Sequence, residues 1–246
     1  MGIKSRLFLL FLISFLLLSP LDAIASSYCQ KSYKDLDSDK KSYEKCLKSL
    51  LDSEPKSVEI LLKLASLYLK SDRVSKGFEL ISKAYSIDPN YIQKSSLSKV
   101  LDLALRLTQL KELAQKNRDF ELFNELGKDY YKMGIFKDSQ NAFKESLKIN
   151  PKQNDIKLLL ALSLGNQNRI KLASKLIKEV IDSDPYNFYA NYYYGKILKN
   201  ELGKVEDGNS YLLAAKYIFD NKKPKFKNRA ERDFIKKDLD IELKER

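Results

Sequence analysis

The sequence contains no histidine and no tryptophan, and only two cysteines, eight glycines and six prolines among its 246 residues. Without histidine the chain lacks the commonest proton shuttle and the commonest metal ligand. Two cysteines are too few for a four-ligand structural zinc site. The scarcity of glycine and proline favours long helices joined by short turns over a many-stranded sandwich. We therefore expect an all-helical protein with no cofactor, no bound metal and no catalytic activity.

The charged residues give the chain a basic surface. It has 45 lysines and arginines against 33 aspartates and glutamates, a formal net charge of +12. Its 43% hydrophobic and 32% charged residues are typical of a folded protein. A basic surface favours acidic proteins, anionic lipid headgroups, cell-wall polymers or nucleic acid. No basic run is interleaved with aromatic residues as a nucleic-acid groove requires, so we expect no nucleic-acid partner and leave peripheral membrane association open.

The first residues have the three parts of a secretory signal peptide, which we place at residues 1–25. Lys4 and Arg6 precede an apolar run over residues 7–18, and a small-x-small site ends at Ala25. Cleavage near Ala25 predicts an exported protein, either periplasmic or secreted. The alternative is an uncleaved membrane anchor, but the apolar run is well short of the ~20 residues that span a bilayer.

The two cysteines, Cys29 and Cys46, follow this leader. In an oxidising compartment they are the natural disulfide pair. The polar segment 35–39 looks like a turn whose midpoint is equally far from both, so they would meet at the same height in a helical hairpin. Two buried, reduced thiols are the alternative. Tyr28 stands directly before Cys29, where lipid attachment generally needs a small residue, which argues against a lipoprotein.

The strongest pattern is an internal repeat marked by proline. An acidic or amide residue precedes proline at four places separated by 34, 62 and 34 residues, namely Glu54-Pro55, Asp88-Pro89, Asn150-Pro151 and Asp184-Pro185. Each proline closes an amphipathic stretch, as expected where a helix stops and the chain turns into the next one. The 62-residue interval is 6 residues short of two full units, which predicts one shortened unit.

Between the prolines the apolar residues have helical spacing. In residues 58–91 an apolar stripe is followed by a polar break at residues 71–73 and by a second helix with small residues. Two helices of a hairpin approach closely only where a side chain is nearly absent, and large residues fill the remaining space. The stripe consists of Leu61, Leu64, Ala65 and Tyr68, and the second helix carries Gly77, Ile81 and Ala84.

This alternation of small and large residues, with its period and its closing proline, resembles the tetratricopeptide repeat family. The match is good for residues 58–91, 120–153 and 154–187. It is weaker for 188–221, where the closing proline is missing and Asp207 stands where a small residue is wanted. The missing tryptophan near the start of each unit also departs from the family pattern. The resemblance implies an all-α, right-handed superhelical solenoid of antiparallel helix hairpins.

Three other segments are less regular. Residues 26–57 look like an incomplete helical repeat. Residues 92–119 look like a degenerate helical pair that either bends the superhelix or divides it into two short stacks. Residues 222–246 are dense in charge, and because repeat stacks need a polar terminal cap, we expect a capping helix or a tail there.

The resemblance also implies a function, which is to bind a protein or peptide without a small-molecule substrate. In the family, the first helix of each hairpin lines the concave side and receives an extended peptide or a partner helix. Lysine beside tyrosine and asparagine suits an acidic partner, because lysine pairs with carboxylates, asparagine bonds main-chain amides and tyrosine supplies rigid contact area. The projected register gives nine candidate residues: Asn124, Lys128, Tyr131, Lys132, Tyr189, Tyr192, Lys196, Lys199 and Asn200.

Other interpretations stay open. One alternative is that the basic surface binds polyanions, the cell wall or a membrane surface. Its affinity would then fall steeply as salt rises. Hydrolysis by paired carboxylates is a further hypothesis, but short hairpins have no evident place to enclose two acidic groups. The tyrosines within residues 186–194 also have a purely structural interpretation, which is packing inside their hairpin.

Overall fold

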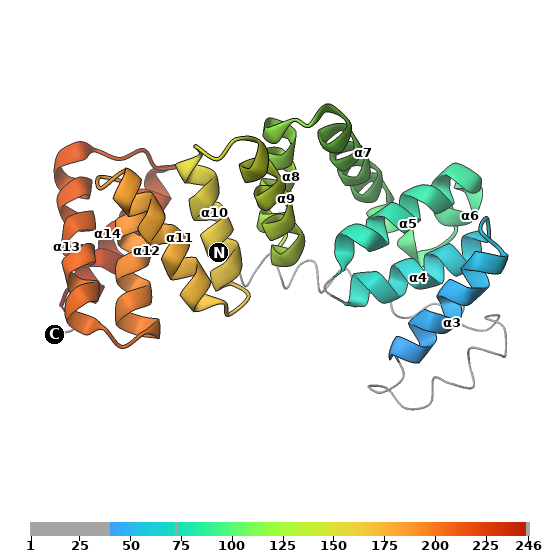
Figure 1. Ribbon diagram of the computed structural model, residues 1–246, viewed down its shortest axis with the longest axis horizontal. Coiled ribbons are helices and arrows are strands. Elements are labelled where there is room, and N and C mark those ends of the chain that lie inside the picture. Colours follow the sequence, from blue (N-terminus) through green and yellow to red (C-terminus); the bar gives the residue numbers. More distant parts are fainter. Residues whose placement is uncertain (1–39, 72, 245–246) are drawn as a thin grey trace. The chain divides into compact units, whose positions relative to one another are not determined.

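The computed structural model describes residues 40–71 and 73–244, and every regular element in these ranges is helical (Figure 1). The predicted all-α class of helix hairpins is therefore confirmed for the described residues. No helix in these ranges combines the length and the apolar character needed to cross a membrane. The predicted leader and Cys29 lie outside the described residues. Cleavage near Ala25 and the pairing of Cys29 with Cys46 therefore stay predictions.

The chain divides into two compact units, and the first ends at Ile149. Its described helices are α3 (Lys40–Ser53), α4 (Val58–Lys70), α5 (Val74–Ile87), α6 (Pro89–Gln93), the 3-10 helix η2 (Ser96–Val100), α7 (Leu101–Asn117), α8 (Phe120–Lys132) and α9 (Phe136–Ile149). α4 pairs with α5, and α8 pairs with α9, as antiparallel hairpins (Figure 1).

The second unit begins at Asn150. It consists of α10 (Asn154–Gly165), α11 (Ile170–Ser183), α12 (Phe188–Lys196), the π-helical turn η3 (Ile197–Glu201), α13 (Val205–Lys222) and α14 (Arg229–Glu242). α10 pairs with α11 and α12 with α13, and α14 packs against the last hairpin.

The repeat prolines stop helices as predicted. α3, α5, α9 and α11 each end two residues before one of them, at Ser53, Ile87, Ile149 and Ser183. The residue between helix and proline is non-helical where it caps α5 and α11, with φ/ψ of −144°/95° at Asp88 and −145°/86° at Asp184. A proline ring disfavours helical backbone in the residue before it, which is why the helices cannot continue.

The shortened unit at residues 92–119 keeps the core of the first unit continuous. α6 and η2 replace a full first helix, and α7 supplies the second helix. The apolar side chains that this segment buries are Ile92, Leu97, Val100, Leu101, Ala104, Leu107, Leu110 and Ala114. All of them except Ala114 belong to one apolar cluster with Leu61 and Phe78 before the segment and Leu126 and Tyr130 after it.

The last hairpin contains one residue more than the hairpin before it. α10 begins at Asn154 and α11 at Ile170, a step of 16, whereas α12 begins at Phe188 and α13 at Val205, a step of 17. The π-helical turn η3 absorbs the extra residue, because a π-turn is a single-residue insertion into an α-helix. As a result Gly208, and not Asp207, faces Gly195 at the helix crossing. The small residue that seemed to be missing is therefore present, one position later.

Candidate functional site

The first predicted cluster lies on α8 and is largely taken up by its own hairpin. The Ser146 hydroxyl donates to Asn124 Oδ1 at 2.6 Å. The ring of Tyr131 meets that of Phe136 edge-on, with centroids 5.5 Å apart. Lys128 and Lys132 are the two exposed members. The four predicted residues thus lie on one helix, where Asn124 and Tyr131 are half-buried and the two lysines are exposed.

The second predicted cluster lies on α12 and η3, in the other unit. α12 begins where the Asn187 side chain accepts a hydrogen bond from the amide of Ala190 at 3.1 Å, which satisfies one free donor of the first turn. The Asn191 side chain donates to the carbonyl oxygens of Pro185 and Asn187, both at 2.9 Å, and ties the helix to its entry turn. These contacts fix where α12 begins and hold it against the turn that precedes it.

α14 covers that side of α12. Its start is fixed by a reciprocal cap, in which Asn228 Oδ1 accepts from the amide of Glu231 at 2.9 Å and Glu231 Oε2 accepts from the amide of Lys227 at 2.6 Å. Ile235 and Leu239 are its buried side chains, at 4% and 1% exposure. They share an apolar cluster with Phe188, Tyr192, Leu212, Ala215 and Ile218.

Two carboxylates of α14, one turn apart, bind the predicted residues of α12. The Tyr192 hydroxyl donates to Asp238 Oδ2 at 2.6 Å. Lys196 Nζ lies 2.8 Å from the same oxygen and 3.2 Å from Glu242 Oε1. The Lys196 ammonium also lies 5.6 Å from the centroid of the Tyr192 ring, within reach of a cation–π contact.

The π-helical turn η3 adds two further donors, and both bind the carboxylate of Glu242. Lys199 Nζ lies 3.3 Å from Glu242 Oε2 and also bonds the main-chain carbonyl of Glu242. The Asn200 side chain donates to Glu242 Oε1 at 3.1 Å. Tyr189, the remaining predicted residue, donates from its hydroxyl to the carbonyl of Lys225 at 3.4 Å, in the segment that leads into α14. All five predicted residues of this cluster therefore contact α14 or its connecting segment.

The electrostatics of the site fit this arrangement. Burial and the hydrogen bond to Asp238 raise the pKa of Tyr192, which keeps its hydroxyl protonated as a donor. Burial acts to raise the pKa of Glu242, but hydrogen bonds from Asn200, Lys196 and Lys199 outweigh it and lower the pKa. Burial, assisted by Glu231, raises the pKa of Tyr189 to about 12. The site thus stabilises the ionised carboxylate of Glu242 on α14.

Asp238 and Glu242, the acidic side of this site, were not predicted from the sequence. A signal for them was present, because Ile235 and Leu239 are four residues apart and each is followed three residues later by one of these acids. That spacing places two apolar and two acidic residues on one helix face. The signal was obscured because the dense charge of the segment favoured a wholly solvated helix.

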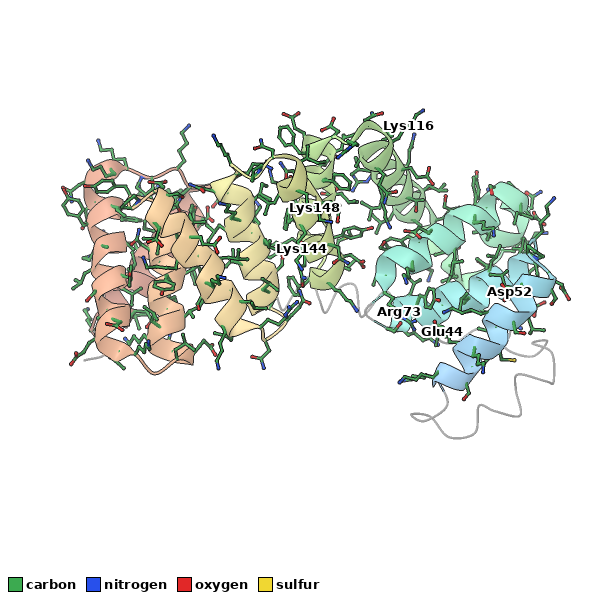
Figure 2. The ribbon with its side chains drawn as sticks, viewed as in Figure 1. Glu44, Asp52, Arg73, Lys116, Lys144 and Lys148 are labelled. Carbon is green, nitrogen blue, oxygen red and sulfur yellow. The ribbon has the colours of Figure 1, made fainter. Side chains whose placement is uncertain are left out.

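A related contact holds α3 in the first unit. Figure 2 shows Glu44 and Arg73 beside each other, where α3 meets the turn between α4 and α5. Glu44 accepts from Arg73 Nη1 at 2.7 Å and from the Tyr68 hydroxyl at 3.1 Å. Burial acts to raise the pKa of Glu44, but hydrogen bonds from Lys48, Arg73 and Tyr68 lower it to about 2. Cys46 of α3 is half-buried.

The residues that the structure describes contain no group of three or more acidic or cysteine side chains placed to hold a metal ion. No protein-family model and no curated protein matches the chain. It is similar to solved structures, among them "Crystal structure of MamA", with 17% identity and a TM-score of 0.41 over 75% of this chain and 91% of that one. "MamA 41-end from Desulfovibrio magneticus RS-1" is 11% identical, with a TM-score of 0.41 over 76% of this chain and 89% of that one.

A further similar structure is "Crystal structure of YrrB: a TPR protein with an unusual peptide-binding site". It is 13% identical, with a TM-score of 0.38 over 81% of this chain and 93% of that one. These likenesses concern the fold alone.

Proposed function

We propose that the chain is an exported, non-catalytic scaffold that binds a protein or peptide partner through the first helices of its hairpins. One observation carries the proposal, which is that the predicted residues of α12 already bind a helix. Tyr192, Lys196 and Asn200 hold the carboxylates of α14 with direct hydrogen bonds. Side chains that bind an acidic helix within the chain have the chemistry to bind one from another protein.

Export is supported by the sequence of the first 25 residues, with their basic start, apolar run and small-x-small site. The absence of histidine throughout the sequence supports a role without catalysis. In this proposal the partner is a protein or peptide with acidic side chains, since lysines make up four of the nine predicted residues.

The test is capture of partners from an extract of the source cell's envelope, with the mature chain of residues 26–246 as bait. The informative variant is Lys128→Glu/Lys132→Glu, which reverses the charge of both lysines on α8. Its matched control is Lys144→Glu/Lys148→Glu, which makes the same change of charge on α9 (Figure 2). We expect a discrete protein that the wild type and the control retain and that the α8 variant loses.

The second candidate function is binding to polyanions, the cell wall or a membrane surface, and the net charge of +12 is the observation that favours it. It predicts that both charge-reversal variants bind less, and that binding falls steeply as salt rises. This function would replace the scaffold if the wild type captured only polymer, if salt washed that polymer off, and if both variants captured equally less of it.

A further inference from the structure

The occupant of the α12 surface is an amphipathic helix with a simple pattern. Counting from Ile235, apolar residues stand at the first and fifth positions and carboxylates at the fourth and eighth, the last being Glu242. Residues three and four apart are neighbours on a helix, so all four side chains point to one side. The apolar pair enters the cluster around Phe188 and Leu212, and the carboxylates meet the lysines of α12 and η3.

The polar contacts are the specific part of this interface. Each carboxylate binds a lysine and a neutral donor. Asp238 binds Lys196 and the Tyr192 hydroxyl. Glu242 binds Lys199 and the Asn200 side-chain amide. The two carboxylates have side-chain exposures of 22% and 12%, so their charges depend on these donors more than on water. A hydrophobic helix without carboxylates would leave the lysines unpaired, which disfavours it.

The apolar part of the interface is small. Ile235 and Leu239 are buried, whereas Phe234 and Ile241 of the same helix are 66% and 47% exposed. Phe226 of the connecting segment and Leu243 at the end of α14 are only partly buried beside them. Because buried apolar area is the main source of stability, a helix with two fully buried side chains separates from its unit more readily than a helix of the core does. The segment that joins α14 to α13 begins at Lys223, whose φ of 47° is left-handed, and spans residues 223–228.

We propose that α14 is an internal occupant of a binding surface for acidic amphipathic helices, and that a partner helix with the same pattern displaces it. This inference rests on the proposed function and names its partner class. The partner presents two apolar residues four apart, each followed three residues later by a carboxylate. α14 competes with that partner from within the chain, where a short connection gives it a high effective concentration.

An extended acidic peptide fits the surface less well. In an extended strand alternate side chains point to opposite sides, so the apolar and acidic residues of this spacing would not share a face. A simple polyanion also fits poorly, because it has nothing to place beside Phe188 and Leu212. The geometry thus selects a folded or folding helix over the other acidic ligands.

The test uses the full chain and a labelled synthetic peptide with the sequence of residues 226–244. The variant Ile235→Ser/Leu239→Ser removes the apolar anchors of α14 and frees the surface. Fluorescence anisotropy should show the peptide bound at least about tenfold more tightly by this variant than by the wild type, whose own α14 competes. A control peptide with Asp238→Lys/Glu242→Lys should bind the variant at least about tenfold more weakly than the native peptide.

Equal binding of the peptide by wild type and variant, or binding by neither, would overturn the proposal. If the serine variant fails to fold, Asp238→Asn/Glu242→Gln replaces it, since this change keeps the apolar anchors. Hydrogen exchange of residues 229–242 should then be at least about tenfold faster, while α12 and α13 exchange as in the wild type. Unchanged exchange would contradict displacement.

The peptide test and the capture test can fail independently of each other. A chain that binds the peptide in the unmasked variant but captures no protein would keep the surface and lose the proposed scaffold. A chain that captures a protein through α8 but never binds the peptide would keep the scaffold and lose the role of α14.

Discussion

The two terminal helices of the described chain, α3 and α14, are held by the same kinds of group. In each case a carboxylate of the terminal helix accepts a hydrogen bond from a buried tyrosine and pairs with a cation that lies over the ring of that tyrosine. For α3 the tyrosine is Tyr68, and Arg73 lies 4.3 Å from its ring centroid. For α14 it is Tyr192, and Lys196 lies 5.6 Å away.

The difference lies in what each helix covers. α3 packs against α4 through Leu47, with Tyr43, Leu50 and Leu51 partly buried beside it, and through the carboxylate of Glu44. α4 carries none of the predicted binding residues. α14 uses two carboxylates and covers most of the predicted residues of α12 and η3. The same combination of carboxylate, tyrosine and cation therefore attaches a terminal helix in both units. Only in the second unit does that helix cover candidate binding residues. A terminal helix has to be judged by the residues beneath it, because its own composition does not distinguish the two cases.

The largest expected effect comes from the apolar anchor of α14. Leu239→Ala should lower the free energy of opening of α14 by about 2–4 kcal/mol, because it removes a buried side chain from a helix that has only two. Hydrogen exchange of residues 229–242 measures this opening. Phe234→Ala on the same helix is the matched control, since its side chain is 66% exposed, and it should change the opening by less than about 0.5 kcal/mol. Similar effects of the two variants would contradict the assigned face of α14.

Much of the fold followed from sequence, and particular residues show why. The four repeat prolines predicted helix ends because proline acts on the residue before it, which is a local effect. The hairpin pairing followed from the spacing of small residues such as Gly127, which lies so close to Phe143 that an added Cβ would be 2.5 Å from its ring. Local rules of this kind need no knowledge of distant contacts.

The sequence predicted only part of the candidate site. The register correctly placed Tyr192 and Lys196 on one side of α12, but it did not reveal that Asp238, more than 40 residues away, meets them. That contact depends on where the chain returns after α13, which periodicity does not encode. The π-helical turn was missed for a related reason, because one inserted residue shifts the register of everything after it without changing the composition.

The second prediction concerns the hairpin that supports α14. Gly208→Ala should destabilise the protein by about 1–3 kcal/mol, because the added Cβ would lie 2.8 Å from the carbonyl oxygen of Gly195 and 2.8 Å from Lys199. Gly165→Ala is the control, since no atom lies within 4 Å of its added Cβ. Because alanine is favoured over glycine in a helix, the control should be neutral or slightly stabilising. Denaturant unfolding measures both, and an equal loss in the two variants would contradict the close crossing.

The third prediction compares the cations of the two ends. Lys196→Met should weaken α14 by about 1–2 kcal/mol, because it leaves Asp238 and Glu242 with fewer donors in a half-buried place. Arg73→Met should weaken α3 by a similar amount through Glu44. Lys237→Met, on the exposed side of α14, is the control for loss of charge alone. Hydrogen exchange should locate each effect in its own terminal helix, and an effect of Lys196→Met on α3 would contradict the local assignment.

The smallest expected effect is the response to acid, and it tests whether the two ends share one mechanism. Glu242 and Glu44 both have a folded-state pKa below the ordinary value of 4.5, and that of Glu44 is about 2. A lowered pKa contributes stability that is present above the unfolded pKa and is lost as the pH falls through the folded pKa. Both terminal helices should therefore open more readily as the pH falls below about 4.5, by about 1 kcal/mol after solvent screening.

Glu242→Gln should remove this acid response from α14 and leave it in α3, whereas Glu44→Gln should do the reverse. Amide exchange between about pH 6 and about pH 3, corrected for the intrinsic rate, separates the two helices in one experiment. Loss of the response at both ends from a single substitution would show that the ends are coupled. Retention at α14 in Glu242→Gln would show that ionisation of Glu242 is not the source of the acid response. This second outcome would show that the charge of Glu242 is not what a partner helix has to reproduce.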